Sequence, residues 1–252
     1  MDRFYDPREL TQEISRVVVR GTSRKYYRRA RPGRWYGGIS TADCVGCNLK
    51  CVFCWSNKPR DNPRAIGQFY TPEEICESLV RCARTSGYTL LRVSGNEPTV
   101  SREHLLELLR LVEETKYRFI LETNGILLDR GYARLLKDFT HLFVRVSLKG
   151  STRDEFSRLT GADPVGFDLQ LEALRNLVAY GVSCHAAVML SFSTEKSFAR
   201  LVSRLKKIRP RLGSDIEREY VILYPHVVKR LKEAGLKPVV ALNRNGSPRK
   251  VR

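Results

Sequence analysis

From residue 35 onward, short apolar segments alternate with stretches of helical pattern, and this alternation limits the fold more than any other feature of the chain. Strands separated by helices of about 10–15 residues form βαβ units, in which consecutive strands run parallel. Six such strands predict an α/β fold, a partial (β/α)6 barrel of parallel strands with outer helices. The expected strands are Tyr36–Thr41, Leu90–Ser94, Arg118–Glu122, Leu142–Leu148, Ser183–Leu190 and Tyr220–Tyr224.

The connecting segments carry signals for helix starts and stops. Thr71-Pro72-Glu73-Glu74 is typical of an N-cap followed by a first-turn proline and a capping-box glutamate. Thr152-Arg153-Asp154-Glu155 has a similar form, and Gly181 and Pro210 are suited to end helices. The expected helices therefore begin near residues 72 and 153, and others cover 105–112, 166–180 and 197–209.

The length and composition predict one domain. A chain of 252 residues, 42% of them hydrophobic, can build one sizeable core. We expect the core domain over residues 35–236. Residues 1–34 are expected to form a basic N-terminal arm, because 20–34 carry seven Lys or Arg and two adjacent tyrosines. Residues 237–252 are expected to be a basic C-terminal tail that is frayed at its end, since Gly and Pro interrupt it.

The chain is strongly basic, with 45 Lys and Arg against 27 Asp and Glu and a net charge of +18. Such a surface attracts polyanions, so an acidic protein or RNA is an expected partner or substrate. A basic proteome or a highly charged thermostable surface is the alternative reading of the same charge. The sequence shows no apolar run of about 18 residues and no apolar region of a secretory signal at its start. We therefore expect a cytoplasmic protein without a membrane partner.

Cys47, Cys51 and Cys54 lie within eight residues, directly after the first expected strand. In a reducing cytosol, clustered cysteines are metal ligands or catalytic thiols more often than disulfides. Three thiolates can hold three irons of a cubane cluster, which normally takes four ligands. Cys44 adds a fourth thiol, so a four-cysteine zinc or iron–sulfur site is the local alternative, although it would be cramped for zinc. The remaining cysteines are expected to be packed or surface thiols, namely Cys76, Cys82 and Cys184.

The spacing Cys47-x3-Cys51-x2-Cys54, with Phe53 before the last cysteine, resembles the signature of the radical S-adenosylmethionine (radical SAM) family. Three later segments resemble further motifs of that family. SGNEPT at 94–99 resembles its GGEP motif, ETNG at 122–125 its third-strand motif, and RVSLK at 145–149 its fourth-strand motif. Each segment falls at the C-terminal end of an expected strand, and in a parallel (β/α) architecture these ends open on one face. The resemblance covers about residues 35–225.

This resemblance implies a partial barrel of the radical SAM type, which binds a [4Fe–4S] cluster and S-adenosylmethionine (SAM). Cys47, Cys51 and Cys54 would ligate the cluster, and its open iron would chelate the amino and carboxylate groups of SAM. One electron would cleave SAM to methionine and a 5′-deoxyadenosyl radical, which abstracts hydrogen from a substrate. An electron donor of the flavodoxin or ferredoxin type is implied as a partner. The residues implied in SAM binding are Phe53, Gly95, Asn96, Glu97, Pro98, Thr123, Asn124, Ser147, Lys149 and Met189, the last within an apolar wall formed with Val188 and Leu190.

Two positions depart from the family pattern, and they bear on the choice of branch. Asn96 stands where a small residue commonly precedes the glutamate, and we expect Asn to tolerate unusual backbone angles there. The Leu148-Lys149 pair resembles the branch that activates pyruvate formate-lyase, but Ser147 stands where that branch often has Asp. The branch implies glycyl-radical activation of a macromolecular substrate, and no catalytic residue is assigned.

Two alternatives to glycyl-radical activation stay open. The segment CVFCW at 51–55 resembles wyosine-type synthases, which are radical SAM enzymes that modify tRNA. Those enzymes carry additional N-terminal cysteines, whereas only Cys44 precedes the motif here. The second alternative is a non-enzymatic module that binds zinc or an iron–sulfur cluster.

Overall fold

The structure is a computed structural model that describes residues 4–244 and 246–250. Its main sheet contains six parallel strands in sequential order, as the alternation of strand and helix patterns predicts. They are β3 (Ile39–Cys44), β5 (Leu90–Ser94), β6 (Arg118–Thr123), β7 (Leu142–Leu148), β8 (Cys184–Met189) and β9 (Glu217–Glu219). The expected α/β fold, a partial barrel of parallel strands with outer helices, is confirmed.

The first and last of these strands do not lie where the sequence predicts them. The first begins at Ile39 rather than Tyr36, because Tyr36, Gly37 and Gly38 all have positive φ and form a turn. The last lies at Glu217–Glu219 rather than Tyr220–Tyr224. Its two glutamates pair with Arg145 of β7, so β9 has no apolar pattern by which it could be recognised.

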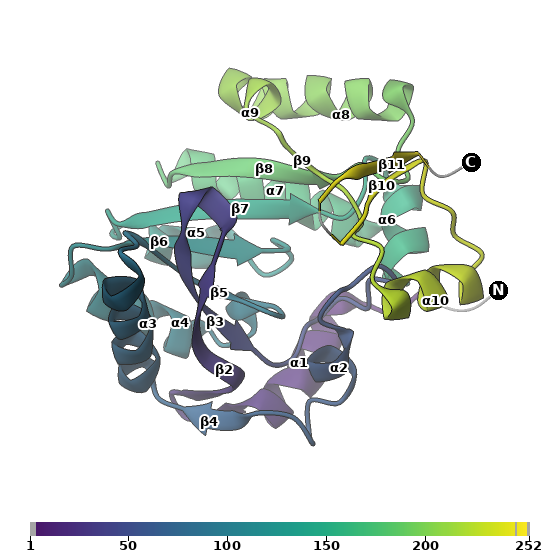
Figure 1. The fold of residues 1–252 in the computed structure, drawn as a ribbon. Coiled ribbons are helices and arrows are strands. Elements are labelled where there is room, and N and C mark those ends of the chain that lie inside the picture. Colours follow the sequence, from purple (N-terminus) through teal and green to yellow (C-terminus); the bar gives the residue numbers. More distant parts are fainter. Residues whose placement is uncertain (1–3, 245, 251–252) are drawn as a thin grey trace.

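The segment that was expected as an N-terminal arm contributes to the sheet. It forms α1 (Pro7–Val18), β1 (Val19–Arg20) and β2 (Ser23–Gly33), and β2 pairs antiparallel with β3 and with β4 (Gln68–Tyr70). In Figure 1, β2 runs across the front of the parallel strands. Its basic residues divide between two environments, since Arg24 and Lys25 are buried while Arg28 and Arg29 are exposed. A high density of basic residues therefore does not mark an exposed arm here.

Helices connect the parallel strands, and Figure 1 shows α3, α4 and α8 on the outside of the curved sheet. The capping box of Thr71 and Glu74 forms as predicted. Thr152 also caps its helix, but Glu155 accepts hydrogen bonds from Ser151 instead of closing a box. The helices are α2 (Asn57–Asp61), α3 (Pro72–Ser86), α4 (Arg102–Glu113), α5 (Arg130–Leu136), α6 (Arg153–Thr160), α7 (Val165–Ala179), α8 (Glu195–Ile208), α9 (Pro210–Ser214) and α10 (Pro225–Glu233), with 3-10 turns at Trp35–Gly37 and Pro98–Val100.

The core lies between the outer helices and the sheet. Leucines of α4 and α7 and the apolar side chains of β5, β6 and β7 form one continuous buried cluster. Because side chains alternate across a strand, the other face of the same strands is free to carry polar groups. In the described part of the chain, none of the helices combines the length and the apolar character that a membrane span requires.

The C-terminal segment is more ordered than the expected frayed tail. β10 (Val240–Leu242) and β11 (Pro248–Lys250) form an antiparallel pair. The backbone of Leu242 is also hydrogen-bonded to Val221 and Leu223. Gly246 lies between the two strands and Pro248 begins β11, and the pair is held against the segment after β9.

His104 of α4 predicts a decrease in stability at mildly acid pH. Its Nδ1–H donates to the carbonyl of Thr22, and its Nε2 accepts from the hydroxyl of Tyr26, each at 2.8 Å. Burial lowers the pKa of His104 to about 4, below its ordinary value of 6.5. As the pH falls, His104 is protonated in the unfolded chain before it is protonated in the folded protein. The contribution of the neutral, buried His104 to stability is therefore complete above pH 6.5 and decreases as the pH falls toward 4. We expect the wild type to lose up to about 3 kcal/mol of unfolding free energy over this window. His104→Gln should lose less in denaturant titrations at pH 7 and pH 4.5, and equal losses would contradict this assignment.

Candidate active site

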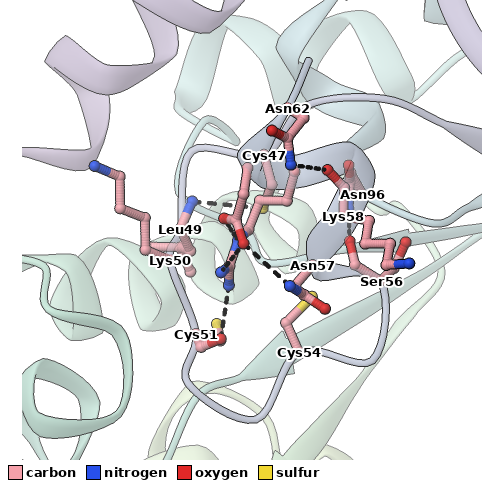
Figure 2. Close-up of polar contacts among 12 residues, drawn as sticks. Cys47, Leu49, Lys50, Cys51, Cys54, Ser56, Asn57, Lys58, Asn62 and Asn96 are labelled. Carbon is pink, nitrogen blue, oxygen red and sulfur yellow. Dashed lines mark hydrogen bonds and ion pairs between the residues drawn. The ribbon is translucent and has the colours of Figure 1, made fainter. Parts of the chain in front are cut away.

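The loop after β3 carries Cys47, Cys51 and Cys54, and Figure 2 shows them spaced along it. All three thiols line a cavity of about 650 Å³. Much of the remaining lining comes from the C-terminal ends of the parallel strands, with Ser94 on β5, Thr123 on β6 and further residues on β7, β8 and β9. β2, the turn after it and the segment after β9 also contribute to the lining. A ligand cavity at this end of a parallel α/β fold is where active sites are built.

The structure brings almost all of the sequence-predicted site residues to this one cavity. The exception is Pro98, which is buried and whose carbonyl accepts a hydrogen bond from Arg24. In the predicted apolar wall, Met189 lines the cavity, whereas Val188 faces the core on the other side of β8. Leu190 is also outside the lining. Residues of the prediction that do line the cavity are Cys47, Cys51, Cys54, Phe53, Gly95, Asn96, Glu97, Thr123, Asn124, Ser147, Lys149 and Met189.

The three thiols have the donor chemistry of an iron–sulfur cluster. Burial raises the pKa of each thiol, that of Cys51 to about 11, so an anionic sulfur at this place needs a bound cation. Among the described residues, no three His, Cys, Asp or Glu side chains are close enough to hold a single metal ion. In a cluster each thiolate binds a different iron, so its ligands stand farther apart than those of one ion. The three thiols that line the cavity are therefore the donor set that a [4Fe–4S] cluster would use.

Cys44 is separated from the other three thiols. It lies in β3, is fully buried in the core and does not line the cavity. Its Sγ accepts a hydrogen bond of 3.4 Å from Arg24. Arg24 is itself fully buried and also donates to the carbonyls of Val45, Glu97 and Pro98. Arg24 thus ties the start of the cysteine loop to the loop after β5, and sequence reasoning missed it because its basic neighbours suggested an exposed segment.

Gly95 and Asn96 connect the loop after β5 to the cysteine loop after β3. Gly95 has a φ of +86°, and a Cβ there would come within 2.9 Å of the carbonyl oxygen of Cys44. Asn96 does not need an unusual backbone angle, since Gly95 supplies it. Its Oδ1 accepts from the backbone of Gly46, and its Nδ2 donates to the carbonyls of Ser56 and Gly95. Asn96 therefore holds both ends of the cysteine loop, a role that the sequence motif did not suggest.

Glu97 connects the loops after β5 and β6. Its carboxylate accepts four hydrogen bonds of 2.6–3.1 Å, from the backbone and hydroxyl of Thr99, the hydroxyl of Thr123 and the backbone of Asn124. The side chain is buried. A buried carboxylate that accepts from four donors holds two of the strand-end motifs in fixed relation.

Replacing Glu97 with alanine should destabilise the protein. The change leaves the four donors without their acceptor in a buried place, and each unsatisfied group costs about 1–3 kcal/mol before relaxation. We expect a loss of about 2–4 kcal/mol of unfolding free energy in denaturant titration. Glu77→Ala on the exposed face of α3 is the matched control, with an expected change within about 0.5 kcal/mol. Equal behaviour of the two variants would show that the carboxylate is not structural.

Asn124 and Gln170 extend this network below the cysteine loop. Asn124 donates to the Oδ1 of Asn48 at 2.7 Å, and Asn48 donates in turn to Thr11 of α1. Gln170 of α7 is fully buried; it donates to the carbonyls of Asn124 and Ser147 and accepts from the backbone of Lys149. Gln170 thus fixes the ends of β6 and β7 relative to each other. No motif of the sequence distinguishes this helical glutamine.

Lys149 and Ser147 belong to a charged network at the ends of β7 and β9. Lys149 donates to the hydroxyl of Ser147 at 2.6 Å, and that hydroxyl donates to Glu219 at 2.6 Å. Arg145 forms ion pairs with Glu217 and Glu219. Burial opposes ionisation of Glu219, but Arg145 and Lys149 outweigh it and hold its pKa at about 2. The carboxylate is therefore charged at neutral pH, and Lys149 is positioned at the cavity wall.

Two arginines contact the backbone of the cysteine loop. Arg60 of α2 donates to the carbonyl of Cys51 at 2.7 Å, and Arg230 of α10 donates to the carbonyl of Cys54. His226 of α10 contacts the carbonyl of Trp55 at 3.1 Å. The Nη1 of Arg230 is buried and has no hydrogen-bond partner among residues 4–244 and 246–250. A buried N–H donor of this kind beside cysteine ligands suits an acceptor such as a cluster sulfur.

The fold and the site together define an α/β partial-barrel protein with three thiols on one cavity at the carboxyl ends of its parallel strands. The sequence model of the Radical SAM superfamily matches residues 43–205, which is more than half of the chain. The chain therefore belongs to the radical SAM superfamily, and membership implies a [4Fe–4S] cluster and SAM.

The chain is similar in sequence to proteins that are named for different activities. It is 33% identical over 156 residues to Fe-coproporphyrin III synthase of Methanosarcina barkeri, covering 61% of this chain and 36% of that protein. It is 27% identical over 170 residues to a protein of Saccharolobus islandicus named "Probable GTP 3′,8-cyclase", covering 66% of this chain and 51% of that protein. The chain thus spans about a third to a half of the length of these relatives.

A solved structure supports the fold. SuiB of Streptococcus suis bound to S-adenosylmethionine superposes with a TM-score of 0.55 at 21% identity, over 66% of this chain and 36% of that one. At this level of identity the likeness concerns the fold alone.

Proposed function

We propose that the cavity is the active site of a radical SAM enzyme in which Cys47, Cys51 and Cys54 ligate a [4Fe–4S] cluster. One observation carries this proposal: the three thiols, but not Cys44, open on the same cavity as the motifs from three different strands. When bound and reduced, the cluster supplies the electron that cleaves SAM to methionine and a 5′-deoxyadenosyl radical, which abstracts hydrogen from the substrate. Radical SAM enzymes need a reductant, and a flavodoxin or ferredoxin is the proposed donor.

The residues of the chain bind and orient SAM in this proposal. Lys149 supplies a cation for the SAM carboxylate, and Thr123 and Asn124 supply polar groups on the same wall. Phe53 and Met189 supply apolar contact for the adenine. The remaining motif residues hold the loops rather than contact SAM through their side chains. The carboxylate of Glu97 already accepts from four donors, and the carbonyls of Glu97 and Pro98 accept from Arg24.

The substrate remains a separate proposal. The relatives have names that refer to an iron coproporphyrin and to GTP, both small molecules. Glycyl-radical activation and tRNA modification of the wyosine type remain predictions of the sequence motifs, and neither is among the activities that those names state. We favour a small-molecule substrate for this chain.

The test is spectroscopic and requires no substrate. The protein is reconstituted anaerobically with iron and sulfide, and its cluster is reduced and examined by electron paramagnetic resonance with and without SAM. We expect SAM to change the spectrum, since the amino acid group of SAM is proposed to bind the cluster. Lys149→Met should require more SAM for the same change. A protein whose reduced cluster keeps the same spectrum at saturating SAM would contradict the proposal and favour a metal-binding module.

A further inference from the structure

The cavity continues beyond the residues assigned to SAM, and this second part has a chemistry of its own. It is bounded by the turn between β2 and β3 and by the inner face of β5, β6, β7 and β9. We propose that this part binds a planar nitrogen heterocycle of about purine size, which stacks on Trp35 and Tyr36 and hydrogen-bonds to Glu122. The inference rests on the proposed function, because the heterocycle would be the substrate of the same site.

Exposed aromatic side chains gather at this cavity. Trp35, Tyr36 and Trp55 are 56%, 40% and 48% exposed, and all three line the cavity. Both tryptophans of the chain thus line the same cavity. Exposing large aromatic rings forfeits the burial that usually stabilises them, so such rings cluster where a ligand covers them. Aromatic rings also accept any flat heterocycle by stacking.

The turn that carries Trp35 and Tyr36 is held in an unusual conformation. Tyr36 has a φ of 55° and is the one described residue other than glycine with a positive φ. Strained backbone of this kind costs energy and is concentrated at ligand sites. The hydroxyl of Tyr36 donates to Glu122 of β6 at 3.1 Å, which brings the turn across the cavity to the opposite wall. This hydrogen bond holds the Tyr36 ring over the polar face of the sheet, and Trp35 precedes it in the same turn.

Glu122 offers a free acceptor beneath these rings. Its Oε1 accepts from Arg92 at 2.6 Å and from Tyr36. Its Oε2 has no hydrogen-bond partner among the described residues, and the side chain lines the cavity at 18% exposure. A carboxylate oxygen held in place by two donors on its neighbour accepts N–H groups from the edge of a heterocycle, as carboxylates do from base edges.

The buried and half-buried arginines on the floor of this part are ion-paired, while the exposed Arg28 and Arg218 also line the cavity. Three buried or half-buried arginines on the floor are each paired with a carboxylate, as Arg31 with Asp43, Arg92 with Glu122, and Arg145 with Glu217 and Glu219. No cation of these pairs is free to neutralise a ligand that carries several carboxylates. The pairs instead present donors and acceptors side by side, which suits the alternating edge of a nitrogen heterocycle.

The heterocycle could belong to a free nucleoside or to a base in RNA, and a binding experiment separates these sources. Reconstituted protein loaded with SAM is titrated calorimetrically with guanosine, adenosine, a single-stranded oligoribonucleotide and a hexapeptide without aromatic residues. The same titrations are made with Trp35→Ala, with Glu122→Gln and with Phe4→Ala, which removes an exposed aromatic ring outside the cavity. The absorption of the cluster confirms that each variant is folded.

We expect at least one heterocyclic ligand to bind saturably. Trp35→Ala should weaken that binding at least about fivefold, which is the size of a stacking contribution. Glu122→Gln should weaken it about tenfold, because the free oxygen becomes an N–H donor in one amide orientation and loses its charge in the other. Phe4→Ala should bind like the wild type. Binding of the nucleosides identifies a free nucleoside as the ligand, and binding of the oligoribonucleotide alone identifies a base in RNA. Either result supports the proposal if Trp35→Ala and Glu122→Gln weaken the binding.

Other outcomes overturn the proposal. Binding that is unaffected by Trp35→Ala and Glu122→Gln would place the heterocycle elsewhere, and binding of the peptide alone would identify a different substrate class. A protein whose cluster responds to SAM but which binds no heterocycle refutes this inference and leaves the proposed function intact. A protein whose cluster does not respond to SAM refutes the proposed function first.

Discussion

Replacing Cys51 with alanine is expected to abolish assembly of the [4Fe–4S] cluster. Cys51 is buried at the cavity wall, and its place in the loop is fixed by the hydrogen bond from Arg60 to its carbonyl. A cluster that depends on three protein thiolates cannot replace one of them with a methyl group. Iron content and the visible absorption of the reconstituted protein should both fall at least about tenfold. Mutating a residue that only supports a metal ligand already lowers metal affinity about 10–100-fold, and here a ligand itself is removed.

Two other cysteines are the controls for this experiment. Cys82→Ala on α3 should load iron like the wild type, because Cys82 does not line the cavity. Cys44→Ala should also retain the cluster, since the Cys44 thiol faces Arg24 and the core. Loss of iron in Cys44→Ala without loss of the fold would show that four cysteines bind the metal, and normal loading in Cys51→Ala would contradict the three-thiol site.

Arg24→Met is expected to be the most destabilising change among the residues that support the site. Arg24 is fully buried, and its guanidinium donates to three backbone carbonyls and to Cys44 without a carboxylate partner. Methionine fills part of the space but leaves these acceptors unsatisfied, at about 1–3 kcal/mol for each group before relaxation. We expect a loss of about 3–5 kcal/mol in unfolding free energy, together with poor loading of iron, because the two loops are no longer tied.

The matched control for Arg24 lies on the same strand. Arg29 is exposed and its guanidinium stacks over Tyr70 at 5.3 Å. An exposed cation–π contact contributes about 0.5–1 kcal/mol. Arg29→Met should therefore change the unfolding free energy by no more than about 1 kcal/mol and leave iron loading unchanged. Similar losses in the two variants would mean that the buried hydrogen bonds of Arg24 have no special role.

The strand-end motifs could be predicted because they are local in sequence. Four short segments, each at the end of an apolar strand, indicate both the fold and the residues that line the cavity, and the sheet order brings them together as expected. The cysteine spacing predicts the donor set for the same reason. Buried parallel strands form short apolar runs in the sequence, and for these elements the sequence pattern and the structure agree most closely.

Residues that act across long sequence separations could not be predicted in this way. Arg24 contacts residues more than 70 positions away, and Gln170 joins two strands through backbone carbonyls. Neither lies in a motif. Strand β9 escaped prediction because its side chains pair with Arg145 of β7 and not with an apolar core. Asn96 was noted as a departure from the family pattern, but its hydrogen bonds to both ends of the cysteine loop depend on the tertiary fold.

Cleavage of SAM by one-electron reduction at the three-thiol site is the reaction that we propose for this chain. The direct measurement is anaerobic: reconstituted protein is incubated with SAM and dithionite, and 5′-deoxyadenosine is quantified beside Cys51→Ala and Cys82→Ala. We expect 5′-deoxyadenosine from the wild type and from Cys82→Ala, and none above background from Cys51→Ala. Equal amounts from the wild type and Cys51→Ala would contradict it, as would no product from a wild type whose cluster is loaded, reduced and supplied with the heterocycle that it binds.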